Sequence, residues 1–388
     1  MVIENLSLEE KIGQKLMVGL CAKNTKEIVY DLIVKHKIGG VLLYKDNYKN
    51  YEEMIDLINY IKKTNSKFNK IPIFIAIDQE GGRVNRMPPE ILNLPSCNKI
   101  AKTNDENFVK ESASLIAKIL KKSGINMDFA PVLDIKRFDD NQAIGDRAFC
   151  DDKEIVAKFG IDFMKELQKE DVISVIKHFP GHGATKTDSH FMIPIVNKKI
   201  EDLENEDEYP FIEAINNGAD TLLVSHLLIK KISKNKPITM SKKFIKGYLR
   251  NKFDGVIISD DMRMGSLRIS YGKYTPIIKA FLAGNDIVLF KYLSNDKIYK
   301  KLHKVVQKDV AINKEINESV EKIDTVYITG TAALINNIDL YFEEYLENAK
   351  CEILKPDFIK IKQDMNIKDY IEVNSAISIA LMGLGVGI

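Results

Sequence analysis

The stretch Val172–His190, which reads VISVIKHFPGHGATKTDSH, determines how the rest of the chain is interpreted. Its first five residues form an apolar run typical of a buried strand. The segment Lys177–His190 then brings together three histidines, two lysines and an Asp-x-His pair. A polar loop of this kind, following the carboxyl end of a buried strand, is where α/β enzymes place their chemistry. The alternative is a polar turn with satisfied histidines, which fits one histidine better than three.

Similar apolar runs recur along the first three quarters of the chain, separated by amphipathic segments with helical spacing. The eight candidate strands are Lys15–Leu20, Ile38–Leu43, Ile73–Ile77, Asn126–Pro131, Val172–Ile176, Thr221–Val224, Gly255–Ser259 and Asp286–Phe290. Short Val- and Ile-rich runs that alternate with helical patterns predict βα units and a parallel sheet. Eight such units predict an α/β fold, a (β/α)8 TIM-type barrel over residues 1–324. An open doubly wound sheet is the structural alternative.

Several predicted strands end in polar residues, and these ends should meet at one mouth of a barrel. Asp78 and Arg86 follow the third strand, and Arg147 comes after the fourth. Lys177 and His178 follow the fifth strand, and Ser225-His226 follow the sixth. Ser259-Asp260-Asp261 ends the seventh. The convergence of so many polar strand ends supports the strand assignment.

The residue types point to a sugar-cleaving reaction. Asp188 beside His190 would fix the imidazole tautomer and raise its basicity, as a proton shuttle requires. Asp260 is a candidate carboxylate nucleophile, although Asp260-Asp261 could instead cap a helix. Charged groups such as Arg86, Arg147 and Lys177, together with Asp78 and His178, could grip sugar hydroxyls by charge-assisted hydrogen bonds. Together these groups indicate retaining glycoside hydrolysis with histidine, not a second carboxylate, as the acid/base.

Four motifs carry a resemblance to a known family. They are DQEGGRVNR (Asp78–Arg86), GDRAF (Gly145–Phe149), KHFPGHGATKTDSH (Lys177–His190) and SDDMRM (Ser259–Met264). Over roughly residues 5–325 the sequence resembles the β-N-acetylglucosaminidases of glycoside hydrolase family 3, in the single-barrel bacterial branch of NagZ type. It departs from the family pattern at Ala184, where Asp is frequent, and at Met262-Arg263, where Leu-Ser is usual. These departures concern loop packing and substrate fit, since they remove no reacting group.

The resemblance implies roles for particular residues. It makes Asp260 the nucleophile and His190, paired with Asp188, the acid/base. Its sugar-binding positions fall on Asp78, Arg86, Arg147, Lys177 and His178. It implies a substrate with a terminal non-reducing β-linked N-acetylglucosamine, no cofactor and no metal. It also implies a mobile loop carrying His190 and a role in cell-wall muropeptide recycling or chitooligosaccharide breakdown.

The composition of the chain argues against several other classes of protein. Lys and Arg total 57 against 55 Asp and Glu, a net charge of +2 without a basic stripe, which argues against nucleic acid as a partner. The four scattered cysteines predict neither a zinc knuckle nor a disulfide framework, which fits a reducing compartment. Neither a signal peptide nor a membrane-length apolar run is apparent. We therefore expect a cytoplasmic protein, and the resemblance implies that its partner is a small amino-sugar oligosaccharide.

Residues 325–388 are expected to form a small C-terminal α/β accessory unit. Thr325–Thr329 is strand-like and Ala332–Ala349 helical, and the chain ends in a glycine-rich apolar segment, Ala376–Ile388. The stretch from Val326 faintly resembles a fragment of the C-terminal subdomain of actin-like ATPases. A second glycine after Gly330 and any other phosphate loop are missing, so we expect no ATP site. Packing on the barrel or self-association, for example as a homodimer, is the expected role.

Three other functions remain open at this point. A metal-dependent hydrolase on the same barrel could use His178, His182, His190 and Asp188 as ligands, and activity that survives EDTA would exclude it. A non-catalytic sugar-binding protein would keep Asp78, Arg147 and Lys177 without turnover. A family 3 β-glucosidase or xylosidase would prefer glucosides to N-acetylglucosaminides, although the Asp-x-His pair favours the N-acetyl-sugar branch.

Overall fold

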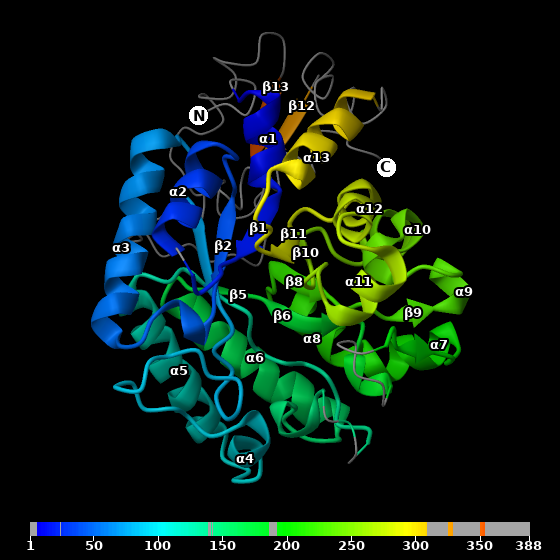
Figure 1. The fold of residues 1–388 in the computed structure, drawn as a ribbon. Helices are drawn as coiled ribbons and strands as arrows, with labels where there is room; N and C mark the ends of the chain where they lie inside the picture. The colour runs from blue at the N-terminus through cyan, green and yellow to red at the C-terminus, as the bar shows by residue number, and fades with distance from the viewer. Residues whose placement is uncertain are drawn as a thin grey trace.

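Parallel strands occupy the centre of the molecule and helices surround them (Figure 1). The computed structural model describes residues 6–23, 25–138, 141, 143–185, 192–308, 325–328 and 350–353. The central strands are β1 (Leu16–Gly19), β2 (Gly40–Leu43), β3 (Phe74–Ile77), β4 (Met127–Asp128), β5 (Ile173–Ser174), β6 (Ile176–Phe179), β8 (Thr221–Val224), β10 (Val256–Ser259) and β11 (Val288–Lys291). All eight predicted strands are therefore present.

The central strands fall into two parallel sheets. The sheets meet at two places, which we call seams: between β5 and β6, and between β10 and β11. One sheet has the order β11-β1-β2-β3-β4-β5, and the other has the order β10-β8-β6. At the first seam the chain passes from β5 to β6 through Val175, so the predicted fifth strand is a single bent strand. At the second seam Ser259 N donates to Ile287 O over 3.0 Å and Ile258 bridges Ile287 in parallel. The order agrees with the predicted (β/α)8 barrel.

Alternate side chains of these strands point to the centre of the ring. Met17, Leu42, Ala76, Val175, Ile258 and Leu289 belong to one apolar cluster of buried residues. Since side chains alternate along a strand, the residue two positions further on faces the same side. That step leads from Ala76 to Asp78, from Val175 to Lys177 and from Ile258 to Asp260. The strands therefore end in a polar layer directly above an apolar interior.

Helices pack outside the strands. They are α1 (Leu8–Gln14), α2 (Thr25–Val34), α3 (Tyr51–Phe68), α4 (Cys97–Ala101), α5 (Glu106–Ser123), α6 (Lys153–Lys169), α7 (Ile200–Asp202), α8 (Tyr209–Asn216), α9 (Lys230–Ser233), α10 (Lys242–Phe244), α11 (Gly265–Tyr271), α12 (Thr275–Ala283) and α13 (Lys297–Lys308). The predicted capping box at the start of α1 is confirmed: Glu10 N donates to Ser7 Oγ, and Ser7 N donates to a Glu10 carboxylate oxygen. Asn50, Asp105 and Asp152 cap α3, α5 and α6. Such caps satisfy amide groups that a helix leaves free at its first turn.

Two predicted helices differ from expectation. The segment Ile200–Asn217 contains α7, the π-helix η5 (Leu203–Asp207) and α8, and Ser241–Asn251 contains α10 and the π-helix η7 (Ile245–Leu249). A buried polar network accompanies η5 and η7. The Tyr248 hydroxyl lies 2.9 Å from Glu204 Oε1 and 2.8 Å from Oε1 of the fully buried Glu208, so its one proton is shared between two acceptors, and Lys252 binds both carboxylates. Hydrophobic spacing alone gives no sign of such a network.

Of the predicted C-terminal unit, the structure describes two short strands, β12 (Thr325–Ile328) and β13 (Lys350–Ile353), which pair in parallel. The predicted strand Thr325–Thr329 is thus confirmed over four residues. The predicted helix Ala332–Ala349 and the tail Ala376–Ile388 lie outside the described residues.

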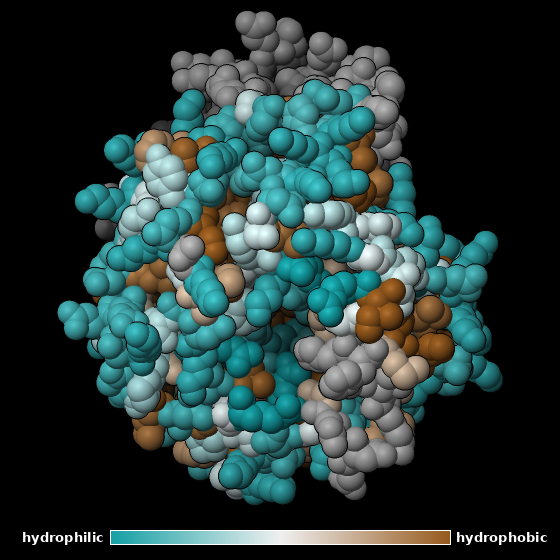
Figure 2. All heavy atoms as spheres, viewed as in Figure 1, coloured by the Kyte–Doolittle hydropathy of each residue, from teal (hydrophilic) through white to brown (hydrophobic). Residues whose placement is uncertain are grey.

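The surface seen in Figure 2 is mostly hydrophilic, with a recess near its centre. Among the described helices none is both long and apolar enough to cross a bilayer.

Candidate active site

The polar layer above the barrel interior contains Asp78, Lys177 and Asp260, which come from β3, β6 and β10. Lys177 lies at its centre. Its ammonium contacts Asp78 Oδ1 at 2.7 Å and Glu80 Oε1 at 2.6 Å, and only 2% of the lysine is exposed. Burial alone lowers the pKa of Lys177, but the two carboxylates outweigh this effect and raise it. Lys177 is therefore a permanently charged, immobilised cation.

Arg147 shares the Glu80 carboxylate with Lys177. Arg147 Nε donates to Glu80 Oε2 over 2.8 Å and Nη2 donates to Oε1 over 2.7 Å, so the pair is bidentate. Burial by itself raises the pKa of Glu80, but Arg147 and Lys177 reverse the shift and hold it far below its usual range. Glu80 is 2% exposed and orients both cations. The sequence interpretation included Arg147 and Lys177 but not this carboxylate.

His178 is held from both sides of its ring. Its Nδ1 lies 2.6 Å from Asp134 Oδ2, and Arg147 Nη2 donates to Nε2 over 3.1 Å. Because Arg147 can only donate, the His178 proton is on Nδ1 and faces Asp134. Asp134 is fully buried and also accepts from His182 N at 2.5 Å. Asp134 therefore fixes both His178 and the start of the following loop.

The loop after β6 begins with further fixed contacts. His182 starts the short helix η4 (His182–Ala184), and burial lowers the pKa of its imidazole to about 4, so it is neutral at pH 7. Asn141 Nδ2 donates to Thr185 O over 2.8 Å. Gly183 lies against the backbone, where an added Cβ would come within 2.0 Å of Ile135 O. The segment that leads toward Asp188 is thus anchored as far as Thr185.

Asp260 directly follows β10 and faces the same mouth. Its amide donates to Val224 O over 3.0 Å, and Asp260 Oδ1 accepts from Asp261 N at 2.7 Å. Burial raises the pKa of Asp260 when considered alone, but the nearby His226 and His178 side chains, the Asp261 amide and Lys177 together lower it. Asp260 is therefore an ionised carboxylate at neutral pH, with Oδ2 free of hydrogen bonds to the described residues.

Asp261 has a different environment. Its Oδ1 accepts from Arg263 N at 2.9 Å and from Lys291 N at 3.1 Å, while burial raises its pKa. His226, which is fully buried, binds Asp261 O through Nε2 at 2.9 Å. Asp261 therefore ties the loop to β11, which leaves Asp260 as the better nucleophile of the two. The helix-cap alternative is not observed, since neither carboxylate caps α11.

Two further residues near the mouth, Arg86 and Asp128, each have one buried side-chain atom without a partner among the described residues. Arg86 Nε is buried with no hydrogen bond, although Arg86 N donates to Gln79 Oε1 over 2.9 Å. Asp128 is fully buried, and its Oδ1 accepts from Gln79 N at 2.9 Å while Oδ2 has no partner. Burial raises the pKa of Asp128 well above its ordinary value. Arg86 thus keeps donor capacity for a ligand.

The structure brings together Asp78, Lys177, Arg147 and His178 in one bonded network, with Asp260 in the same layer. The predicted acid/base pair Asp188 and His190 lies outside the described residues. Glu80, Asp134 and His226 were missed as functional candidates. Glu80 stood within a quoted motif, His226 was named at the end of the sixth strand without a role, and Asp134 follows the fourth strand, so position near a strand end could have identified all three.

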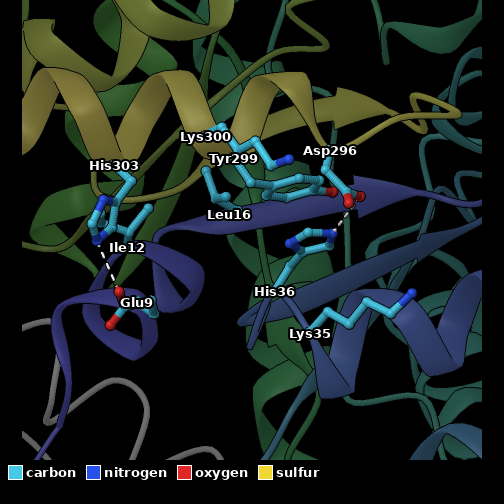
Figure 3. A pocket seen from close by; sticks show the side chains of 9 residues that line it. All are labelled: Glu9, Ile12, Leu16, Lys35, His36, Asp296, Tyr299, Lys300 and His303. Atoms are coloured by element: carbon cyan, nitrogen blue, oxygen red, sulfur yellow. Dashed lines mark hydrogen bonds and ion pairs between the residues drawn. The ribbon is translucent and has the colours of Figure 1, made fainter.

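A separate cavity of about 360 Å³ lies between α1, the end of α2 and α13. In Figure 3 Glu9 and His303 point toward one another on one side, and His36 lies under the Tyr299 ring on the other. His303 Nε2 is 2.8 Å from Glu9, His36 Nε2 is 3.1 Å from Asp296, and the His36 and Tyr299 rings stack at 3.5 Å. None of the residues in the bonded network or the Asp260 loop lines this cavity.

Comparison with known proteins identifies the family. Residues 7–326 match the model of the glycosyl hydrolase family 3 N-terminal domain. The chain belongs to glycosyl hydrolase family 3. As a family 3 protein it is a glycoside hydrolase, and its α/β fold is that of its solved relatives.

A relative from Xylella fastidiosa (strain M23), named beta-hexosaminidase, is 31% identical over 71% of this chain and 82% of its own. The structure of a family 3 beta-N-acetylglucosaminidase from Paenibacillus is similar with a TM-score of 0.76 and 27% identity, over 95% of this chain and 68% of that one. NagZ from Neisseria gonorrhoeae, solved with N-trifluoroacetyl-D-glucosamine, gives a TM-score of 0.63 and 28% identity, over 75% and 84%. The predicted resemblance is confirmed.

Met262 and Arg263, two of the positions noted above as departures from the family pattern, both make defined contacts. Met262 is 1% exposed and packs in the main apolar cluster. Arg263 Nη1 donates to Tyr292 O over 2.8 Å and lies 3.4 Å from Lys291 O. Arg263 therefore fastens the end of β11 beside the Asp260 loop.

Proposed function

We propose that this protein is a retaining exo-β-N-acetylglucosaminidase that removes a terminal non-reducing β-linked N-acetylglucosamine. The observation that carries the proposal is the shared layer of an ionised Asp260 and the Asp78–Lys177 pair. In such a layer Asp260 can attack a sugar while Asp78 and Lys177 hold it. The names of the family 3 relatives, beta-hexosaminidase and beta-N-acetylglucosaminidase, support the choice of N-acetyl sugar.

In this proposal the Asp260 carboxylate attacks the anomeric carbon and forms a covalent glycosyl-enzyme, which water then hydrolyses. Its free Oδ2 and lowered pKa suit this role. Asp261 is unsuited because its carboxylate is bonded to two backbone amides and its pKa is raised. The bond from Asp261 N to Asp260 Oδ1 fixes the orientation of the attacking carboxylate.

Asp78, Lys177, Arg147, His178 and Arg86 are proposed to bind the sugar hydroxyls and the acetamido group. Glu80 and Asp134 hold three of these side chains in place before substrate arrives. A pre-oriented site loses less side-chain entropy on binding. Arg86 supplies a guanidinium with an unused donor.

His190, paired with Asp188, is proposed as the acid that protonates the leaving oxygen and as the base that activates water. Asp188 would hold the imidazole in one tautomer and stabilise its protonated form. Anchoring of the preceding segment by Asp134 and Asn141 keeps the start of this loop at the same mouth as Asp260. Muropeptides and chitooligosaccharides are the proposed natural substrates.

Release of 4-nitrophenol from its N-acetyl-β-glucosaminide tests the proposal. Asp260→Asn should abolish nearly all turnover. Asp261→Asn is the matched control, because an amide oxygen can still accept from Arg263 N and Lys291 N, and it should keep most of the activity. A wild-type protein that prefers the β-glucoside, or an active Asp260→Asn variant, would contradict the proposal. Muropeptides assayed beside chitobiose would identify the natural substrate.

A further inference from the structure

Tyr44 occupies the same layer as the proposed nucleophile, but the function proposed above gives it no role. Leu42, two residues earlier, belongs to the interior apolar cluster, and the Tyr44 ring packs on that cluster. Leu43 pairs with Ile77 in the sheet, so Tyr44 is the neighbour of Asp78 on the adjoining strand. The side chain of Tyr44 therefore faces the mouth beside a proposed sugar-binding carboxylate.

The absence of a side chain at Gly19 allows the phenol to cross the end of β1. A Cβ at Gly19 would lie 2.7 Å from the Tyr44 oxygen and 2.8 Å from Cε2. Beyond Gly19, which pairs with Lys291 on β11, the Lys291 ammonium lies 5.1 Å from the centre of the Tyr44 ring. A cation at this distance from an aromatic face is attracted to it. Glycine on one strand and lysine on the next thus fix the position of the phenol.

The hydroxyl group of Tyr44 is available to a ligand. Within the described part of the chain it makes no hydrogen bond, even though Asp78, Asp260 and Asp261 lie close enough to influence it electrostatically. Burial, and after it these carboxylates, raise the pKa of Tyr44 well above its ordinary value. The phenol therefore remains neutral and keeps its proton across the working range of pH. An unpaired neutral donor in a sugar-binding layer can bond a sugar hydroxyl.

We propose that the Tyr44 hydroxyl contacts substrate directly, bonding a ring hydroxyl of the terminal sugar between Asp78 and Asp260. This inference rests on the proposed function and adds a specificity determinant to the same site. Tyr44 discriminates between sugars that carry the contacted hydroxyl and those that lack it, because its own hydroxyl would be left without a partner beside the latter.

The test compares Tyr44→Phe with wild type on 4-nitrophenyl N-acetyl-β-glucosaminide and on its 3-, 4- and 6-deoxy analogues. Loss of one neutral hydrogen bond should lower kcat/KM for the parent substrate by about 3- to 10-fold. With one of the three deoxy sugars the two proteins should become equal, because the bond is then missing from both.

Tyr299→Phe is the matched control. Its hydroxyl likewise has no partner among the described residues, but Tyr299 lines the cavity between α1 and α13, away from the mouth (Figure 3). This variant should match wild type on all four substrates. An unchanged Tyr44→Phe variant, or an equal loss on every deoxy sugar, would overturn the assignment of Tyr44. An active Asp260→Asn variant would instead overturn the proposed function.

Discussion

Glu80→Gln tests whether one buried carboxylate holds Arg147 and Lys177, the two cations proposed to bind the sugar. Glu80 makes three short contacts, two with Arg147 at 2.7 and 2.8 Å and one with Lys177 at 2.6 Å. Glutamine keeps one acceptor oxygen but turns an amide donor toward a cation and removes the negative charge. Breaking one partner of a buried ion pair costs about 3–5 kcal/mol. Because Asp78 still pairs with Lys177, we expect a loss of about 3 kcal/mol.

Thermal unfolding followed by circular dichroism measures this loss. At about 2.1 cal/mol/K per residue the unfolding entropy of this 388-residue chain is about 0.8 kcal/mol/K, so a loss of about 3 kcal/mol corresponds to a fall in Tm of roughly 4 °C. Glu106→Gln is the control: Glu106 also bridges two lysines, Lys110 and Lys158, but it lies on the surface with 38% of its side chain exposed. Exposed pairs contribute little, so Tm should hardly change. Equal shifts in the two variants would refute the reasoning.

The pKa of Glu80 predicts how the Tm difference between wild type and Glu80→Gln changes with pH. The pKa of Glu80 in the folded protein lies below its unfolded value of about 4.3. Its stabilising contribution is therefore complete above the unfolded pKa and is lost as pH falls through the folded pKa. The Tm difference between wild type and Glu80→Gln should stay constant from pH 7 to about pH 5 and narrow only below about pH 4. A difference that narrows already between pH 7 and 5 would contradict the low pKa.

Three more predictions concern the reaction and the loop. His190→Ala should lose about 100- to 10,000-fold in kcat/KM with a poor leaving group and far less with a dinitrophenyl glycoside; equal losses with both would contradict an acid role. Because Asp260 stays ionised, kcat/KM for the dinitrophenyl glycoside should remain level down to about pH 5, and an acid limb centred above that pH would contradict the lowered pKa. Gly183→Ala should lower Tm, since the new methyl group would meet Ile135 O, and an unchanged Tm would contradict this packing.

The fold could be predicted because its strands are short apolar runs followed by polar residues. Thr221–Val224 was predicted with the observed bounds. Asn126–Pro131 was predicted longer than the regular ladder of β4, Met127–Asp128, although backbone bonds reach further: Phe129 N donates to Ile77 O over 2.8 Å and Lys177 N donates to Pro131 O over 3.1 Å. The apolar run covers both the regular ladder and these irregular bonds, so sequence alone does not show where regular pairing stops.

The site was predictable in part for a similar reason. Asp78, Lys177 and Asp260 follow interior positions by two residues, so strand alternation brings them to one layer. The contacts that Glu80 and Asp134 make could not be assigned, because they depend on loops that cross from other strands. Tyr44 was missed because its place in the layer depends on Gly19 and Lys291 of neighbouring strands, which only the sheet register brings beside it.

Mass spectrometry of the protein after reaction with a 5-fluoro N-acetylglucosaminyl donor tests the central claim most directly. Such a donor slows hydrolysis of the glycosyl-enzyme, so the covalent intermediate accumulates. We predict one sugar per chain, attached to Asp260. Attachment to Asp261, or turnover of the parent substrate with no adduct at any time, would contradict the account.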